Sequence, residues 1–290
     1  MSGFGYMYLW DETTAKRGAI EIASCLYKFI CTQVPPTIKK LYIFSDNCAG
    51  QNKNYIMQLF YLCVFHTREI EIIHVFFRVG HSYMPADSHF ATIENAIQRH
   101  GQVYTPTCYE KIIKKCRETG SKLIESKMTQ NDFLDFEALK EFTNKNLRKH
   151  PKEENFSTSS YFRVSKDYQY GYEYGHNYLN ISDLEHPSLG NLMRVAKGPN
   201  NENNKNPLSN DNLNFKRGFK NIRLPKKYTK PIPLDRKKAD DLKSYVPQLV
   251  PEEHLNYWNQ VLNLVSTSED DNDDSDADDM FFDEIFTEYE

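Results

Sequence analysis

Acidic, amide and imidazole side chains gather in two short segments, each directly after a run of β-forming residues. In residues 41–52 (LYIFSDNCAGQN), Asp46 ends an apolar run. In residues 80–94 (GHSYMPADSHFATIE), Asp87 and Glu94 accompany two histidines. Carboxylates that meet at strand ends are the ligands a divalent-metal phosphoryl-transfer site needs. The pattern predicts a metal-assisted site for phosphodiester chemistry, with Mg²⁺ or Mn²⁺ as the expected ion.

Six further polar side chains flank these acids. They are His81, His89, Asn47, Gln51, Asn52 and Lys53. A histidine there could ligate a metal, position a nucleophile or protonate a leaving oxygen, the amides could orient carboxylates or touch a phosphate, and the lysine offers a positive charge. A structural alternative stays open. In it Asp46 caps a turn, Asp87 N-caps a helix, and the amides satisfy backbone groups in a tight loop.

Hydrophobic periodicity predicts the elements that position these groups. We expect strands at residues 6–10, 41–45 and 70–79, and helices from Thr13 or Thr14 to Thr32, at 54–66, at 88–99 opened by Asp87, and at 106–117. This β-α-β-α-β-α order implies an α/β fold. We expect one sheet with helices on its faces and functional residues at strand ends.

The second half of the chain has a weaker pattern. We expect a short helix at 133–146, an aromatic-rich β-hairpin at 160–178, and two short helices at 235–245 and 252–264. The expected divisions are a core at 1–130, a helix and β extension at 131–198, an asparagine-rich linker at 199–214, a basic helical region at 215–265, and a disordered acidic tail at 266–290.

The charge is divided unevenly along the chain. Residues 266–290 hold twelve acids and no base, so the 40 acids of the chain leave 28 in the first 265 residues, against 36 bases. That body therefore carries a net charge of +8, which predicts contact with DNA. The tail is expected either to compete with nucleic acid or only to confer solubility. Its last aromatic and acidic residues, 280–289 (MFFDEIFTEY), also fit a protein partner.

The sequence predicts neither secretion nor membrane insertion. The longest apolar run, residues 55–65, is too short to cross a bilayer. The six cysteines include no CxxC pair and are expected to be reduced. A nuclear or cytoplasmic protein is expected.

Four blocks resemble a known group of proteins. The segments YLWDETTAKRGAIEIASCLYKFI, FSDNCAGQNKN and GHSYMPADSHFATIE, and more loosely PIPLDRKKADDLKSYVPQLVPEEHLNYWNQ, look like blocks of transposon-derived metazoan proteins. The core of that group is similar to the RNase-H-like fold of DDE transposases and retroviral integrases. The resemblance covers about residues 5–117. It implies metal-dependent DNA cleavage or strand transfer.

The resemblance also assigns roles to individual acids. Asp46 matches the second acid, at the end of the fourth strand, and Asp87 or Glu94 matches the third. Asp11 follows a strand that maps elsewhere. The chain is expected to begin at the third strand, so the strand with the first acid is missing and the activity is expected to be incomplete or absent. The alternatives are a domesticated DNA-binding protein without catalysis, or a protein-interaction module.

Overall fold

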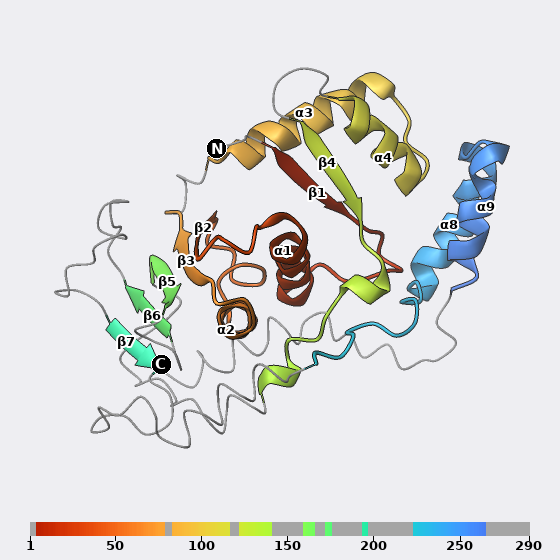
Figure 1. Cartoon of the computed structure of the whole chain (residues 1–290). Coiled ribbons are helices and arrows are strands. Elements are labelled where there is room, and N and C mark those ends of the chain that lie inside the picture. The colour runs from red at the N-terminus through yellow and green to blue at the C-terminus, as the bar shows by residue number, and fades with distance from the viewer. Residues whose placement is uncertain are drawn as a thin grey trace, which may run out of the picture. The chain divides into compact units, whose positions relative to one another are not determined.

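The chain folds into two compact units, each built from segments that lie far apart in the sequence. The computed structural model describes residues 4–78, 83–116, 122–140, 159–165, 172–175, 193–196 and 223–264. The first unit contains Met1–Lys16, Tyr83–Phe133 and Lys226–Glu290, and the second contains Arg17–Ser82 and Leu134–Pro225. Both units combine helices with strands, so the predicted α/β class is confirmed (Figure 1).

A mixed five-stranded sheet forms the second unit. Its strands, in spatial order, are β2 (Lys40–Ser45), β3 (Glu71–Phe76), β5 (Tyr161–Val164), β6 (Tyr172–Gly175) and β7 (Met193–Ala196). Strands β2 and β3 are parallel, whereas β5, β6 and β7 follow in antiparallel pairing. The pairing of β5 with β6 confirms the hairpin expected in the aromatic-rich segment.

Two helices pack against this sheet, α1 (Ala19–Gln33) and α2 (Tyr55–Arg68). The side chain of Asn54 caps α2 by accepting a hydrogen bond from the Met57 N–H at 3.0 Å. The helix is apolar nearly all round because it is buried on both sides, by α1 and by the sheet residues Ile72 and Phe76. It connects the parallel strands β2 and β3, as a parallel pair requires.

The first unit contains a two-stranded parallel sheet, β1 (Gly5–Leu9) with β4 (Leu123–Lys127). Its helices are α3 (Pro85–His100), α4 (Pro106–Lys115), α8 (Arg236–Leu249) and α9 (Glu252–Leu262). Met7, Ile93, Ile113 and Leu123 form the apolar cluster between the strands and α3 and α4. Gly5 lies where a Cβ atom would be 2.6 Å from Leu123 Cδ2, so a larger residue there would force the Leu123 side chain to shift.

Two expectations about these elements are wrong. Strand β1 does not join the sheet of β2 and β3, because it pairs with β4, a short charged strand that the hydrophobic pattern did not reveal. Helix α1 begins at Ala19 rather than at Thr13 or Thr14. The Asp11 carboxylate accepts hydrogen bonds from the backbone N–H and hydroxyl groups of both threonines, which holds them in a turn before the helix.

Other expectations hold in part. Helices α4 and α9 lie where periodicity predicted them, whereas α8 begins where expected but continues through Pro247 to Leu249. In the helix expected at 133–146, residues 133–137 are not helical and residues 138–140 are, while residues 141–146 lie outside the described part of the chain. The linker at 199–214 and the acidic tail also lie outside it. No helix in the described ranges has the length and apolar character needed to span a membrane.

Candidate functional site

Asp46 directly follows β2, at the carboxyl end of the parallel β2–β3 pair. The Phe77 N–H donates to the Ser45 carbonyl at 2.8 Å, and the Asn47 side chain donates to the Phe77 carbonyl at 3.0 Å. These bonds hold the end of β3 beside the loop that follows β2. The exposed carboxylate of Asp46 therefore stands at the edge of the sheet where α/β proteins place functional residues.

The two oxygens of the Asp46 carboxylate have different surroundings. Oδ1 accepts hydrogen bonds from the Cys48 N–H at 3.2 Å and from the Asn52 side chain at 2.7 Å. Oδ2 makes no hydrogen bond within the described residues. The turn-capping role is thus present at Oδ1, while Oδ2 is free to meet a cation or a proton.

Lys53 is buried behind this loop, with 4% of its surface exposed. Its Nζ donates to Asn47 Oδ1 at 3.0 Å and to the Ser159 carbonyl at 2.6 Å, and lies 5.0 Å from the centroid of the Phe76 ring. Burial lowers the pKa of Lys53 to about 8. The side chain therefore ties the loop to the start of β5, whereas the sequence suggested a surface charge for phosphate.

The remaining amides of the loop hold its backbone. The Asn54 side chain donates to the Ala49 carbonyl at 2.8 Å, and the backbone N–H groups of Gln51 and Asn52 donate to the Cys48 carbonyl at 3.4 and 2.8 Å. The structural alternative holds for Asn47, whose side chain donates to the Phe77 carbonyl, whereas the Asn52 side chain donates to the Asp46 carboxylate, as the functional reading expected. The loop is consequently a rigid support for Asp46.

A buried polar chain beneath Asp46 was not foreseen from the sequence. The Tyr61 hydroxyl lies 2.8 Å from His74 Nδ1, His74 Nε2 lies 2.8 Å from Ser45 Oγ, and Ser45 Oγ donates to the Asp46 carbonyl at 2.8 Å. Because the serine proton points at that carbonyl, Ser45 accepts from Nε2–H and Nδ1 accepts from Tyr61. The alternation of β3 places His74 on the same face as the core residue Ile72, a signal that could have revealed this buried histidine.

The charge states of the hydrogen-bonded side chains Tyr61, His74 and Ser45 favour a structural role. Burial, reinforced by the charge of Lys53, lowers the pKa of His74 to about 3. Burial also raises the pKa of Tyr61 well above its ordinary value. Both groups are therefore neutral at pH 7, and His74 is a weak general base. These hydrogen-bonded side chains hold the carboxyl end of β2 in place.

The acids of the second segment lie on α3. The sequence suggested that Asp87 is the N-cap of this helix. It is instead the third residue, because the helix begins at Pro85 and Met84 is the N-cap. Its Oδ2 accepts a hydrogen bond from the Met84 N–H at 2.6 Å. Glu94 is exposed and makes no hydrogen bond or ion pair within the described residues. The two acids are seven residues apart, about 10 Å along the helix axis, so a single ion cannot bind both.

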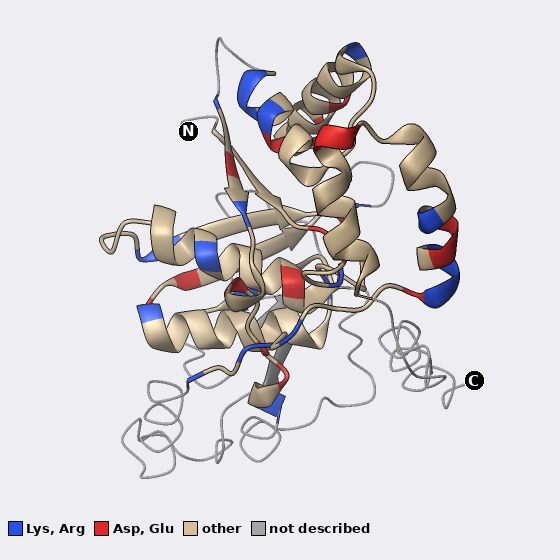
Figure 2. Cartoon of the chain, turned by 90° about the vertical axis from the view of Figure 1, so that its right-hand side faces the viewer, with Lys and Arg blue, Asp and Glu red and all other residues tan. Residues whose placement is uncertain are grey.

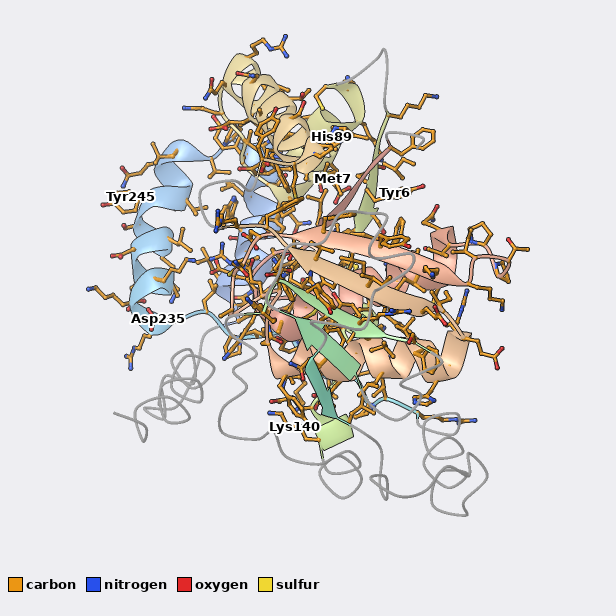
Figure 3. The ribbon with its side chains drawn as sticks, turned by 90° about the vertical axis from the view of Figure 1, so that its left-hand side faces the viewer. Tyr6, Met7, His89, Lys140, Asp235 and Tyr245 are labelled. Carbon is orange, nitrogen blue, oxygen red and sulfur yellow. The ribbon has the colours of Figure 1, made fainter. Side chains whose placement is uncertain are left out.

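The two histidines of this segment have different positions. His89 is half-buried, and a Cβ atom at Gly5 would be 3.2 Å from its Cδ2 and 3.1 Å from Met7 Cε. Figure 3 shows it between α3 and strand β1, close to Met7. The contact with the strand shows that His89 is part of the packing of the first unit. His81 lies outside the described residues.

The predicted site residues divide between the two units. The second unit brings Asp46 together with Asn47, Asn52 and Lys53, whereas the first unit holds Asp87, Glu94 and His89. No group of three histidine, cysteine, aspartate or glutamate side chains in the described part of the chain is arranged to hold a metal ion. The Asp46 loop alone supplies one carboxylate oxygen, which does not fit a two-metal site. The convergence of the three acids stays a prediction.

The fold and this loop define an α/β protein with an acid at the carboxyl end of a parallel strand pair. Residues 6–171 match the family described as Domain of unknown function (DUF7869), and the chain belongs to this family. The matched range includes Asp46, Asp87 and Glu94. No curated protein and no solved structure matches the chain.

Proposed function

We propose that this chain is a transposase-derived protein with an RNase-H-like core for metal-dependent phosphodiester cleavage or strand transfer on DNA, and that this activity is incomplete. The observation that carries the proposal is Asp46 Oδ2, an exposed carboxylate oxygen without a hydrogen bond in the described residues, at the carboxyl end of β2. The β2-α2-β3 unit with its parallel strands is consistent with the last strands of an RNase-H-like sheet. The resemblance of the sequence blocks supports the same origin.

Within this proposal Glu94 is the partner of Asp46. Asp87 is the weaker candidate because its Oδ2 already accepts from the Met84 N–H, which would compete with a cation. A Mg²⁺ or Mn²⁺ ion held there would activate a water and stabilise charge on the phosphate. The chain would supply one ligand oxygen from each acid, while Asn52 keeps the Asp46 carboxylate in its orientation through Oδ1.

The second candidate is a DNA-binding protein without catalysis. The observation that favours it is the use of Asp46 Oδ1, Asn47 and Lys53 to hold the loop itself. A third candidate is a protein-interaction module, which depends on residues 280–289. These lie outside the described residues, so this candidate stays a prediction.

Plasmid nicking in Mn²⁺, together with Mn²⁺ binding measured by electron paramagnetic resonance, tests the proposal. Asp46→Asn keeps the Oδ1 acceptor but removes the charge, so we expect it to abolish weak nicking and to reduce Mn²⁺ binding at least tenfold. Glu94→Gln should do the same, whereas Asp87→Asn should retain both activities.

Asp241→Asn removes an exposed acid of α8 and serves as the matched control. Nicking that persists in Asp46→Asn would exclude this residue as a ligand. A wild-type protein that binds DNA but neither nicks it nor binds Mn²⁺ would leave the second candidate as the function.

A further inference from the structure

A short basic segment precedes and opens α8. Residues 226–238, here named the basic strap, contain six bases and one acid. The bases are Lys226, Lys227, Lys230, Arg236, Lys237 and Lys238. All except Lys227, which is half-buried, are exposed. Figure 2 shows basic residues at the first turn of α8, and Figure 3 marks that turn by Asp235.

The basic strap is held at several points within the first unit. The Lys227 N–H donates to the Phe133 carbonyl at 3.0 Å, and the Ile232 N–H donates to the Thr13 carbonyl at 2.7 Å. The Leu234 N–H donates to the Leu264 carbonyl at 2.6 Å. Prolines at positions 231 and 233 further restrict the backbone. The cations are thus presented on an ordered backbone, which reduces the entropy cost of binding.

Three of these cations have no hydrogen-bonding or ion-pair partner in the described part of the chain. Lys238 pairs with Glu12, and Lys226 donates to Asn131. Lys230, Arg236 and Lys237 make no hydrogen bond or ion pair within the described residues. The structure therefore concentrates positive charge that its described contacts do not neutralise. A polyanion would neutralise it by contacting several cations at once.

The chemistry of the strap favours a nucleic acid over a protein or a membrane. Its large apolar residues are not exposed: Leu234 is 3% exposed and packs with Ala239 and Val261, and Tyr228 and Ile232 are half-buried. Protein interfaces need buried aromatic or aliphatic anchors, and membrane-surface helices need an apolar face. The exposed residues of the strap are five bases, one acid, one threonine and two prolines, and none of them is a large aliphatic or aromatic anchor. We propose that the basic strap binds the phosphate backbone of duplex DNA.

This inference deepens the proposed function, since it rests on DNA as the partner, but it requires neither Asp46 nor a metal ion. The acidic tail is the natural competitor. Residues 266–290, with twelve acids, begin two positions after Leu264, whose carbonyl accepts from Leu234 in the strap. A tethered polyanion acts at a high effective concentration, on the order of millimolar. The tail therefore competes with DNA at low salt, and its deletion tightens binding.

Fluorescence anisotropy with a labelled DNA duplex, in EDTA and at 50 and 200 mM salt, tests the proposal. The strap variant is Lys230→Gln, Arg236→Gln, Lys237→Gln, and the matched control is Arg99→Gln, Lys111→Gln, Lys115→Gln on α3 and α4. Each lost phosphate contact reduces the salt slope by about 0.9. Three contacts therefore make the affinity loss between the two salt concentrations roughly fortyfold smaller in the strap variant. The control triple should keep the wild-type slope.

All proteins are measured with and without residues 266–290, and circular dichroism confirms that each folds. Equal losses in both triples, or an unchanged slope in the strap variant, would overturn the proposal. Absence of DNA binding by the tail-deleted chain would overturn it as well. The anisotropy assay in EDTA measures binding without any metal-dependent step. A strap effect without any nicking would therefore retain this inference while the catalytic proposal fails.

Discussion

Lys53→Met is expected to show how the protein stabilises a buried ammonium behind the Asp46 loop. Burial lowers the pKa of Lys53 from 10.5 to about 8, a difference equivalent to about 3 kcal/mol. At neutral pH this cost is offset by two hydrogen bonds from the charged nitrogen, each contributing about 1.5–3 kcal/mol. Methionine removes the burial cost but leaves Asn47 Oδ1 and the Ser159 carbonyl without this donor. We expect a net destabilisation of about 1–3 kcal/mol at pH 7.

The pH dependence of this effect is more diagnostic than its size. Between pH 8 and 10.5 the folded chain has released the Lys53 proton while the unfolded chain still holds it. The wild-type contribution from this residue therefore rises with pH in this window, by about 3 kcal/mol in total, and is constant below it. Burial raises the pKa of Cys63 and Tyr27 to about 12, which acts in the opposite direction. The stability difference between wild type and Lys53→Met cancels those contributions.

Urea denaturation followed by circular dichroism at several pH values between 7 and 10.5 measures this difference. Lys39→Met, at an exposed lysine, controls for the loss of a surface charge. The stability gap between wild type and Lys53→Met should widen by about 3 kcal/mol across the window. A flat gap would mean that the acceptors and the Phe76 ring fully compensate burial, and the assumption that desolvation dominates would be refuted.

Two further substitutions test other contacts. Tyr61→Phe leaves His74 Nδ1 without its donor and should cost about 1–3 kcal/mol in urea denaturation. Burial lowers the pKa of His74 from 6.5 to about 3, so wild-type stability should fall as the pH drops from 6.5 toward 3. His74→Gln should lack this loss. If the stability of both proteins falls equally with pH, His74 is not the group responsible. Gly5→Ala brings a Cβ atom within 2.6 Å of Leu123 Cδ2 and should lower stability by about 1–3 kcal/mol. Gly50→Ala, with nothing within 4 Å of the new Cβ, should leave it unchanged.

Local sequence signals were sufficient for much of the second unit. The apolar run before Asp46, the apolar pattern of residues 54–66 and the β-forming run at 70–79 predict a β-α-β segment, which the structure confirms. Periodicity and capping are properties of neighbouring residues, so a single sequence reveals them. The position of Asp46 at the end of a strand follows from the same signals.

Pairing between distant segments was beyond those signals. Strand β1 pairs with β4, more than a hundred residues away, and the five residues of β4 show no strong β pattern. The start of α1 also differed, because the Asp11 carboxylate captures Thr13 and Thr14 in a turn. Such competition between a side chain and the helix depends on the local three-dimensional arrangement.

The sequence by itself determined that β2, α2 and β3 form and that an acid follows β2, because these features depend on residues within a few positions of one another. Only the tertiary structure decided what each polar group does there. Lys53 reaches Ser159, more than a hundred residues away, and His74 links Tyr61 to Ser45 across the core. The energy of a buried polar group depends on the partners that folding brings to it and on the loss of water around it. Those partners come from other elements, so residue type and spacing do not identify them.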